Sequence, residues 1–163
     1  MTVAAMLGQQ DDDLADHDGV RLWLRLLTCA TMIEKLLRQR LEREFGTTLS
    51  RFDVLAALQR RPEGMAMSAL SRALLISNGN VTGIVQKLAA EGHVAVERAP
   101  HDRRVSVARL TEAGAAHFAR LAEAHHRWLD ELFGDLPPAA RDDLHAGLSR
   151  LKCSLSTLAE RKP

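Results

Sequence analysis

Apolar residues recur every three or four positions along most of this chain, which is the spacing of an amphipathic helix. In residues 19–45 the apolar stripe includes Leu22, Leu26, Ile33 and Leu37. The pattern predicts about six helices: Gly19 to Phe45, Leu49 to Arg61 with Ser50 as its cap, a short helix capped by Ser68, Ser77 to Glu91 with Gly92 as its left-handed end, a long helix capped by Thr111 and running to about Phe133, and Pro137-Pro138 to Leu158.

Two short stretches follow a different period and predict strands. Residues 94–96 are β-favouring, and in residues 105–108 valines alternate with smaller side chains. The residues between them, 98–104, end in Arg103 and Arg104, and an arginine-bearing hairpin tip suits the narrow, negatively charged minor groove of DNA. The predicted fold class is therefore mainly α with a small β-wing made of a two-stranded ribbon.

The helix from Ser77 to Glu91 has two unlike faces. Its apolar residues repeat at i, i+3, i+4, i+7 and i+8 and predict a buried face: Val81, Ile84, Val85, Leu88 and Ala89. The other face carries amides, a hydroxyl, a glycine and a lysine, namely Asn78, Asn80, Thr82, Gly83, Gln86 and Lys87. Small residues let a backbone approach closely, and amides can meet base edges, so this helix is typical of one that enters a DNA major groove. Ser77 is the expected N-cap, beside which outward N–H groups can bind a phosphate.

Residues around the ribbon resemble a known family. Asp102-Arg103-Arg104, then five residues, then Leu110-Thr111-Glu112-Ala113-Gly114 is similar to the wing signature of the MarR family of winged helix-turn-helix regulators. The segments 74–82 and 88–94 also resemble that family at the right distances, and the likeness extends from about Gly19 to Leu158. The resemblance implies a winged helix-turn-helix fold, a homodimer built from helices of both chain ends, and a wing in which Arg104 pairs with Asp102 and enters the minor groove.

The helices and the resemblance together predict the domain organisation. Residues 1–18 are an acidic arm, residues 19–47 and 112–160 form a helical dimerisation region, and residues 48–111 form the winged helix-turn-helix DNA-binding domain, called the reading head below. The last helix supports this division, because its leucines are spaced alternately four and three apart, as in a helix that packs along another helix. Two-fold symmetry would then place two recognition helices roughly 34 Å apart and predict a pseudo-palindromic operator.

The predicted DNA contacts come from the helix-turn-helix and the wing. Asn80 and Gln86 are the candidates for reading bases, whereas Lys87 and Arg72 are candidates for phosphate contacts. The full expected set is Arg72, Ser77, Asn78, Asn80, Thr82, Gln86, Lys87, Asp102, Arg103 and Arg104. The alternative is that the helix is an ordinary polar surface helix.

An effector site is also implied by the resemblance, since many members of this family bind aromatic carboxylates or related phenolics between the dimer helices and the reading head. The expected lining is Trp23, Arg25, Leu26, Leu27, Phe52 and Leu55, with Trp23 as a flat wall and Arg25 as the carboxylate partner. The segments 45–55 and 77–83 look similar to members that control aromatic-acid catabolism, some of which answer to an acyl-CoA thioester. The alternative is that Trp23 lies in the core and Arg25 in solvent.

Composition narrows the function further. The 163 residues carry a formal net charge of +1, yet residues 60–109 hold eight Lys or Arg against four Asp or Glu, a local excess of +4 on the reading head. Aromatic residues make up only 4%, which argues against stacking on single-stranded bases as the main activity. No apolar run approaches a membrane span, the acidic N-terminus does not resemble a signal peptide, and we expect a cytoplasmic protein.

Other chemistries have weaker support in the sequence. Cys29 and Cys153 lie far apart, and we expect Cys29 to be a buried structural thiol, with a redox switch as the alternative. His117, His125 and His126 share one predicted helix but lack the spacing of a zinc site, so no metal or cofactor is expected and a zinc-sensing variant is the alternative. No nucleophile–base spacing or phosphate-binding loop predicts an enzyme. The sequence therefore predicts a homodimeric, ligand-responsive transcriptional regulator of double-stranded DNA, a repressor released by a small aromatic acid or its CoA thioester. A regulator without a small-molecule ligand is the alternative.

Overall fold

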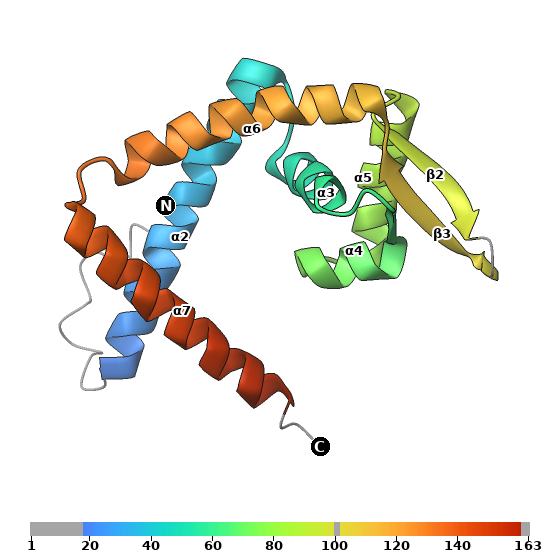
Figure 1. Cartoon of the computed structure of the whole chain (residues 1–163). Helices are drawn as coiled ribbons and strands as arrows, with labels where there is room; N and C mark the ends of the chain where they lie inside the picture. Colours follow the sequence, from blue (N-terminus) through green and yellow to red (C-terminus); the bar gives the residue numbers. More distant parts are fainter. Residues whose placement is uncertain (1–17, 100–101, 161–163) are drawn as a thin grey trace, which may run out of the picture. The chain divides into compact units, whose positions relative to one another are not determined.

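The computed structural model describes residues 18–99 and 102–160, so nearly all of the expected acidic arm lies outside it. In this part of the chain six helices and three strands follow one another, which confirms the predicted fold class. The helices are α2 (Asp18–Phe45), α3 (Leu49–Gln59), α4 (Met67–Leu74), α5 (Asn78–Ala90), α6 (Glu112–Phe133) and α7 (Pro138–Glu160). The strands are β1 (Met65–Ala66), β2 (Val94–Ala99) and β3 (Asp102–Leu110) (Figure 1).

Local capping chemistry sets several helix boundaries. The Ser77 and Thr111 caps are confirmed, because the Ser77 side chain accepts from the Asn80 N–H and Thr111 Oγ1 accepts from the Gly114 N–H at 2.9 Å. The Ser50 and Ser68 caps were wrong predictions. Thr48, two residues earlier, accepts from the Arg51 N–H and caps α3. Helix α4 begins at Met67, directly after β1. Its N-cap residue is therefore Ala66, which has no side-chain group that could form a capping bond.

The small sheet has one strand more than the predicted two-stranded ribbon. All its pairings are antiparallel, and the order is β1-β3-β2, with Met65 opposite Ala108 and Ala66 opposite Val107. A strand of two residues is too short to show alternation, so the sequence pattern gave no signal for it. This strand anchors the start of α4 to the base of the ribbon.

The core of the reading head lies where α3, α4 and α5 meet beside the ribbon (Figure 1). Each helix contributes fully buried aliphatic side chains, and their removal from water is the main force that holds the three helices together. These side chains are Val54, Leu55 and Leu58 of α3, Leu70 of α4, and Val81, Val85 and Leu88 of α5. The predicted buried face of the helix that follows Ser77 is thus largely confirmed.

Helix α6 starts directly against the end of α5. The Thr111 hydroxyl donates to the Gly92 carbonyl at 2.7 Å, and the Thr111 N–H donates to the His93 carbonyl at 3.1 Å. A Cβ at position 114 would overlap that same His93 carbonyl oxygen, so only glycine fits there. Gly92 itself has a φ of +79°, the left-handed conformation predicted for it.

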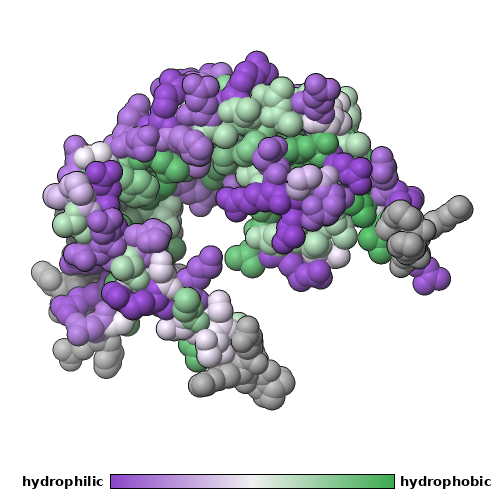
Figure 2. Space-filling model, viewed as in Figure 1, coloured by the Kyte–Doolittle hydropathy of each residue, from purple (hydrophilic) through white to green (hydrophobic). Residues whose placement is uncertain are grey.

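Two compact units make up the chain, one reaching to Ala124 and one from His125 onward. In the second unit the leucines of α7 remain exposed: Leu144, Leu148, Leu151, Leu155 and Leu158. Hydrophobic residues are visible at the surface between the hydrophilic ones in Figure 2. Among the described residues no helix combines the length and the hydropathy that a bilayer crossing requires.

Candidate nucleic-acid interface

Helix α5 presents a polar face to solvent. Asn78, Asn80, Gln86 and Lys87 are exposed, and Thr82 is half-buried. Because Val81, Val85 and Leu88 hold the opposite side in the core, this face is fixed in orientation relative to the rest of the reading head. The structure therefore brings the candidates of this helix together on one accessible surface.

The hydroxyl groups at the start of α5 are already engaged with the helix. Ser77 Oγ accepts from the Asn80 N–H at 3.3 Å, and Thr82 Oγ1 donates to the Asn78 carbonyl at 2.8 Å. Thr82 has thus used its only side-chain hydrogen, and it can offer a partner its methyl group or its oxygen lone pairs. The amides of Asn78 and Asn80 are the exposed groups at this end that can both donate and accept.

Two glycines on α5 leave the helix backbone uncovered. At Gly79 and at Gly83, one turn later, an added Cβ would meet nothing within 4 Å. Glycine within a helix costs about 0.5–1 kcal/mol relative to alanine, and here no neighbouring atom in the chain requires it. Such glycines are what a helix needs if a partner is to approach its backbone closely.

The turn before α5 has an unusual conformation. Leu75 has a φ of +55° and a ψ of +35°, and it is 92% exposed. The Leu75 and Ile76 N–H groups both donate to the Ser71 carbonyl, and Ser71 Oγ donates to the Ile76 carbonyl at 2.6 Å. Arg72, a predicted phosphate contact, is exposed on α4 just before this turn.

The wing is longer and tighter than the sequence predicted. The pairing of β2 with β3 extends to Ala99 opposite Asp102, so the expected loop over residues 98–104 belongs mostly to the strands. The register shifts beyond Arg98, which pairs with Ser106, and residues 103–105 have no registered partner in β2. A bulge of this kind bends a ribbon and redirects its side chains, which local alternation cannot foresee.

The arginines of the wing differ in what the structure describes. Arg104 is exposed, and Arg98 donates to Ser106 Oγ at 3.1 Å. The side chains of Asp102 and Arg103 lie outside the described part of the chain, and so does the expected pairing of Asp102 with Arg104. At the base of the ribbon, the Arg109 guanidinium donates to the Glu63 carbonyl at 3.2 Å and ties β3 to the loop after α3.

A polar cluster that sequence reasoning missed lies behind α5. The guanidinium of Arg51 on α3 forms an ion pair with Glu91, and the His93 ring stacks on the His117 ring of α6 with centroids 4.3 Å apart. Burial lowers the pKa of His117, and the positive charges of His93, Arg120 and Arg51 lower it further, whereas Glu91 opposes the shift. No local motif joins these residues, because Arg51 lies on α3, Glu91 and His93 lie in the turn after α5, and His117 lies on α6.

The predicted effector-site residues fall into two groups. Phe52 and Leu55 are buried in the core of the reading head, where the Phe52 ring lies 5.5 Å from that of Phe118. Trp23, Arg25 and Leu27 are exposed on α2, with Trp23 at 57%, and Leu26 is half-buried. Burial, followed by the Glu34 carboxylate, raises the pKa of Asp53 on α3. Arg25 is the one cation among the six expected lining residues.

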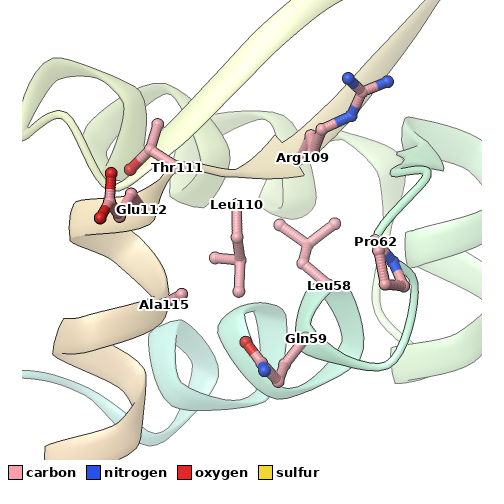
Figure 3. Close-up of a pocket in the computed structure, with 8 residues that line it drawn as sticks. All are labelled: Leu58, Gln59, Pro62, Arg109, Leu110, Thr111, Glu112 and Ala115. Carbon is pink, nitrogen blue, oxygen red and sulfur yellow. The ribbon is translucent and has the colours of Figure 1, made fainter.

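One depression of about 300 Å³ lies elsewhere, between the end of α3, the end of β3 and the start of α6. In Figure 3 the side chains of Leu58 and Leu110 meet at its centre, and the Arg109 guanidinium points away. None of the expected effector residues lines it; its lining is Leu58, Gln59, Pro62, Arg109, Leu110, Thr111, Glu112 and Ala115.

One of the two thiols differs from the prediction. Cys29 is exposed on α2 and is not the buried thiol that was predicted. Cys153 is a free, exposed thiol as well. Within residues 18–99 and 102–160 no three His, Cys, Asp or Glu side chains gather as metal ligands.

Comparison with known proteins gives consistent matches. A family model described as "MarR family" matches residues 45–105. The chain is 36% identical over 118 residues to the "Transcriptional activatory protein BadR" of Rhodopseudomonas palustris, which covers 71% of this chain and 67% of that protein.

Solved structures of similar proteins agree with this match. A MarR family transcriptional regulator from Silicibacter pomeroyi is 34% identical, with a TM-score of 0.73 over 85% of this chain and 95% of that one. The structure of Bordetella bronchiseptica BpsR, whose title states that its DNA binding is regulated by 6-hydroxynicotinic acid, matches with a TM-score of 0.69 at 24% identity over 85% of this chain and 95% of that one.

Proposed function

Because this chain belongs to the MarR family of winged helix-turn-helix transcriptional regulators and is not an enzyme, we propose that α5 enters the major groove of duplex DNA while the β2–β3 wing lies in the adjacent minor groove. The observation that carries this proposal is the exposed face of α5, where amides stand beside two glycines that nothing in the chain covers. Asn80 and Gln86 read bases, and Lys87 and Arg72 contact phosphates. Ser77, Asn78, Thr82, Asp102, Arg103 and Arg104 complete the proposed interface.

The working unit is proposed to be a homodimer. Leucines at alternate spacings of four and three run along α7 and are exposed in the single chain, as are Leu22 and Trp23 near the start of α2. A second copy that covers these side chains would remove a large apolar area from water. Residues 19–47 and 112–160 form the dimerisation region, and residues 48–111 form the reading head. The two-fold axis would favour a pseudo-palindromic operator. The dimer is proposed to act in the cytoplasm.

Regulation is proposed to come from a small aromatic acid or its CoA thioester, bound near Trp23, Arg25, Leu26, Leu27, Phe52 and Leu55. Arg25 supplies the charge for a carboxylate, and Trp23 supplies a flat apolar surface that the single chain leaves open. A ligand that binds more tightly to a dimer with a different spacing of its two reading heads releases the operator. The extent of release is set by the difference between the ligand's affinities for the two states. The name of BadR describes an activator, so experiments should test whether this protein activates or represses transcription.

The DNA proposal is tested with a duplex selected from a random library by the purified protein. Arg104→Ala should weaken binding to the selected duplex roughly tenfold or more while light scattering still reports a dimer, since the arginine is proposed to lie in the minor groove. Arg127→Ala, an exposed arginine on α6 outside the reading head, is the matched control and should bind as the parent does. Failure to enrich any duplex would overturn the proposal.

The ligand proposal needs a separate test. Thermal shift with aromatic carboxylic acids and their CoA thioesters should identify compounds that raise Tm and change duplex affinity. Arg25→Gln should remove the response to the carboxylates and leave DNA binding intact. If no compound of either class raises Tm, the protein regulates without such a ligand.

A further inference from the structure

Leu75, in the turn between α4 and α5, is the only described residue other than glycine with a positive φ, at +55°. Its side chain is 92% exposed, the largest value among the exposed large hydrophobic residues of the described chain. Two features that each oppose folding therefore coincide at one position. A left-handed backbone disfavours a leucine, and exposure to water gives up the gain from burying its side chain.

The turn is nevertheless tightly held. Ser71 accepts the Leu75 and Ile76 N–H groups at its carbonyl, and its hydroxyl donates to the Ile76 carbonyl at 2.6 Å. These bonds fix the backbone on both sides of Leu75, so its side chain leaves the turn in a set direction. Glycine or asparagine would accept this backbone with less strain, and glycine would expose no apolar surface. Folding alone therefore does not account for a leucine here.

The position of Leu75 indicates its partner. Two residues after it comes Ser77, which caps α5, and then Asn78 and Asn80, whose exposed amides begin the proposed DNA-reading face. In a helix-turn-helix this end of the second helix approaches the base edges of the major groove. The apolar group on that surface of duplex DNA is the C5-methyl of thymine, which meets aliphatic side chains.

We propose that Leu75 is a specificity contact of the reading head, held outward by the Ser71 bonds so that its side chain packs on a thymine methyl group at the edge of the operator half-site. This inference rests on the proposed DNA-binding function. It adds a large aliphatic contact to an interface whose other proposed members are mostly polar or charged. It also predicts that binding prefers thymine at one position in each half-site that the polar side chains do not set.

Three variants at this position test the proposal on the duplex selected by the parent protein. Leu75→Gly and Leu75→Asn suit the left-handed backbone, so both should keep or raise Tm, yet weaken duplex binding about threefold to tenfold, the loss expected for one buried apolar contact. Leu75→Met keeps an apolar side chain of similar size and should retain most of the affinity. Fluorescence anisotropy at fixed salt gives the affinities, and thermal unfolding gives Tm.

Uracil in place of single thymines then isolates the methyl group. At one thymine of each half-site the parent should lose affinity by a factor similar to the Leu75→Gly loss, whereas Leu75→Gly should be insensitive to the same change. If the Leu75 variants bind like the parent, or if they weaken binding and no thymine is coupled to them, the proposal is wrong. Unchanged duplex binding together with altered transcription would mean that Leu75 contacts a protein. Failure of the parent to select any duplex would instead count against the DNA-binding function itself.

Discussion

At the scale of single residues, His117 interacts with charged groups from other parts of the chain in a way that the sequence does not reveal. In the sequence it is one of three histidines on a helix, without a motif around it. In the structure its ring stacks on that of His93, and Arg51 and Arg120 add positive charge near it. Burial is the largest reason that its pKa lies below that of a free imidazole. The proton is therefore bound more weakly in the folded chain than in the unfolded one.

This difference sets a sign for the pH dependence of stability. As pH falls below the unfolded pKa of about 6.5, the unfolded chain takes up protons first, so the free energy of unfolding should fall until the pH passes the lower folded pKa. His117→Gln should flatten the curve between pH 7.5 and pH 5.5 in urea unfolding. His125, whose pKa burial also lowers, should leave a residual slope of the same sign. The exposed His145→Gln is the control, and an equal change in both variants would contradict the assignment.

At the scale of elements, capping was predictable where the bond is local. Ser77, Thr111 and Gly92 could be assigned from the sequence because each acts on residues within one turn of itself. The strand β1 could not, because its partners Val107 and Ala108 lie far along the chain. The register shift between β2 and β3 could not either, because alternation along a strand does not show which residues of a hairpin pair. The caps at Ser50 and Ser68 were misassigned for two different reasons: Thr48 caps α3, and β1 leads directly into α4. A serine near an apolar run looks like a cap until a neighbouring threonine or a paired strand takes that place.

Two side-chain caps of the reading head, Thr48 and Ser77, form a matched pair for experiment. Thr48 and Ser77 accept from the backbone N–H three residues on, each at 3.3 Å. Replacing either by alanine should cost about 1 kcal/mol of stability, measured by urea unfolding. Ser77→Ala should in addition weaken duplex binding, because its helix faces the DNA in the proposed complex, whereas Thr48→Ala should not. Equal duplex affinity for the two variants would remove Ser77 from the interface.

The open glycines of α5 give the opposite combination of effects. Gly79→Ala and Gly83→Ala should each raise stability by about 0.5–1 kcal/mol, since nothing in the chain occupies the space of the new methyl group. Both should lower duplex affinity, because the same methyl group would keep the helix backbone away from the groove. Thermal unfolding and anisotropy on one preparation test both effects. A stabilised variant with unchanged affinity would show that the DNA stays clear of these positions.

At the scale of the whole molecule, the leucines of α7 form an apolar surface that the single chain leaves exposed to water. Leu151→Glu places a charge in the middle of the proposed seam, so sedimentation should report a monomer while circular dichroism retains the helical signal. Operator binding should fall sharply, because a monomer can contact only one of the two half-sites at a time. Lys152→Glu makes a charge change at the next residue, outside the leucine seam, and is the control. A dimeric Leu151→Glu variant would require a different interface.

The fit of Gly114 against the His93 carbonyl has a mechanical consequence. With no room for even a methyl group, the first turn of α6 cannot slide or tilt over the exit from α5. The hydrogen bonds from Thr111 to the carbonyls of Gly92 and His93 also hold the start of α6 to the end of α5. Helix α6 is therefore held closely to the end of α5, and in the proposed DNA complex a rotation of α6 would turn α5 within the groove.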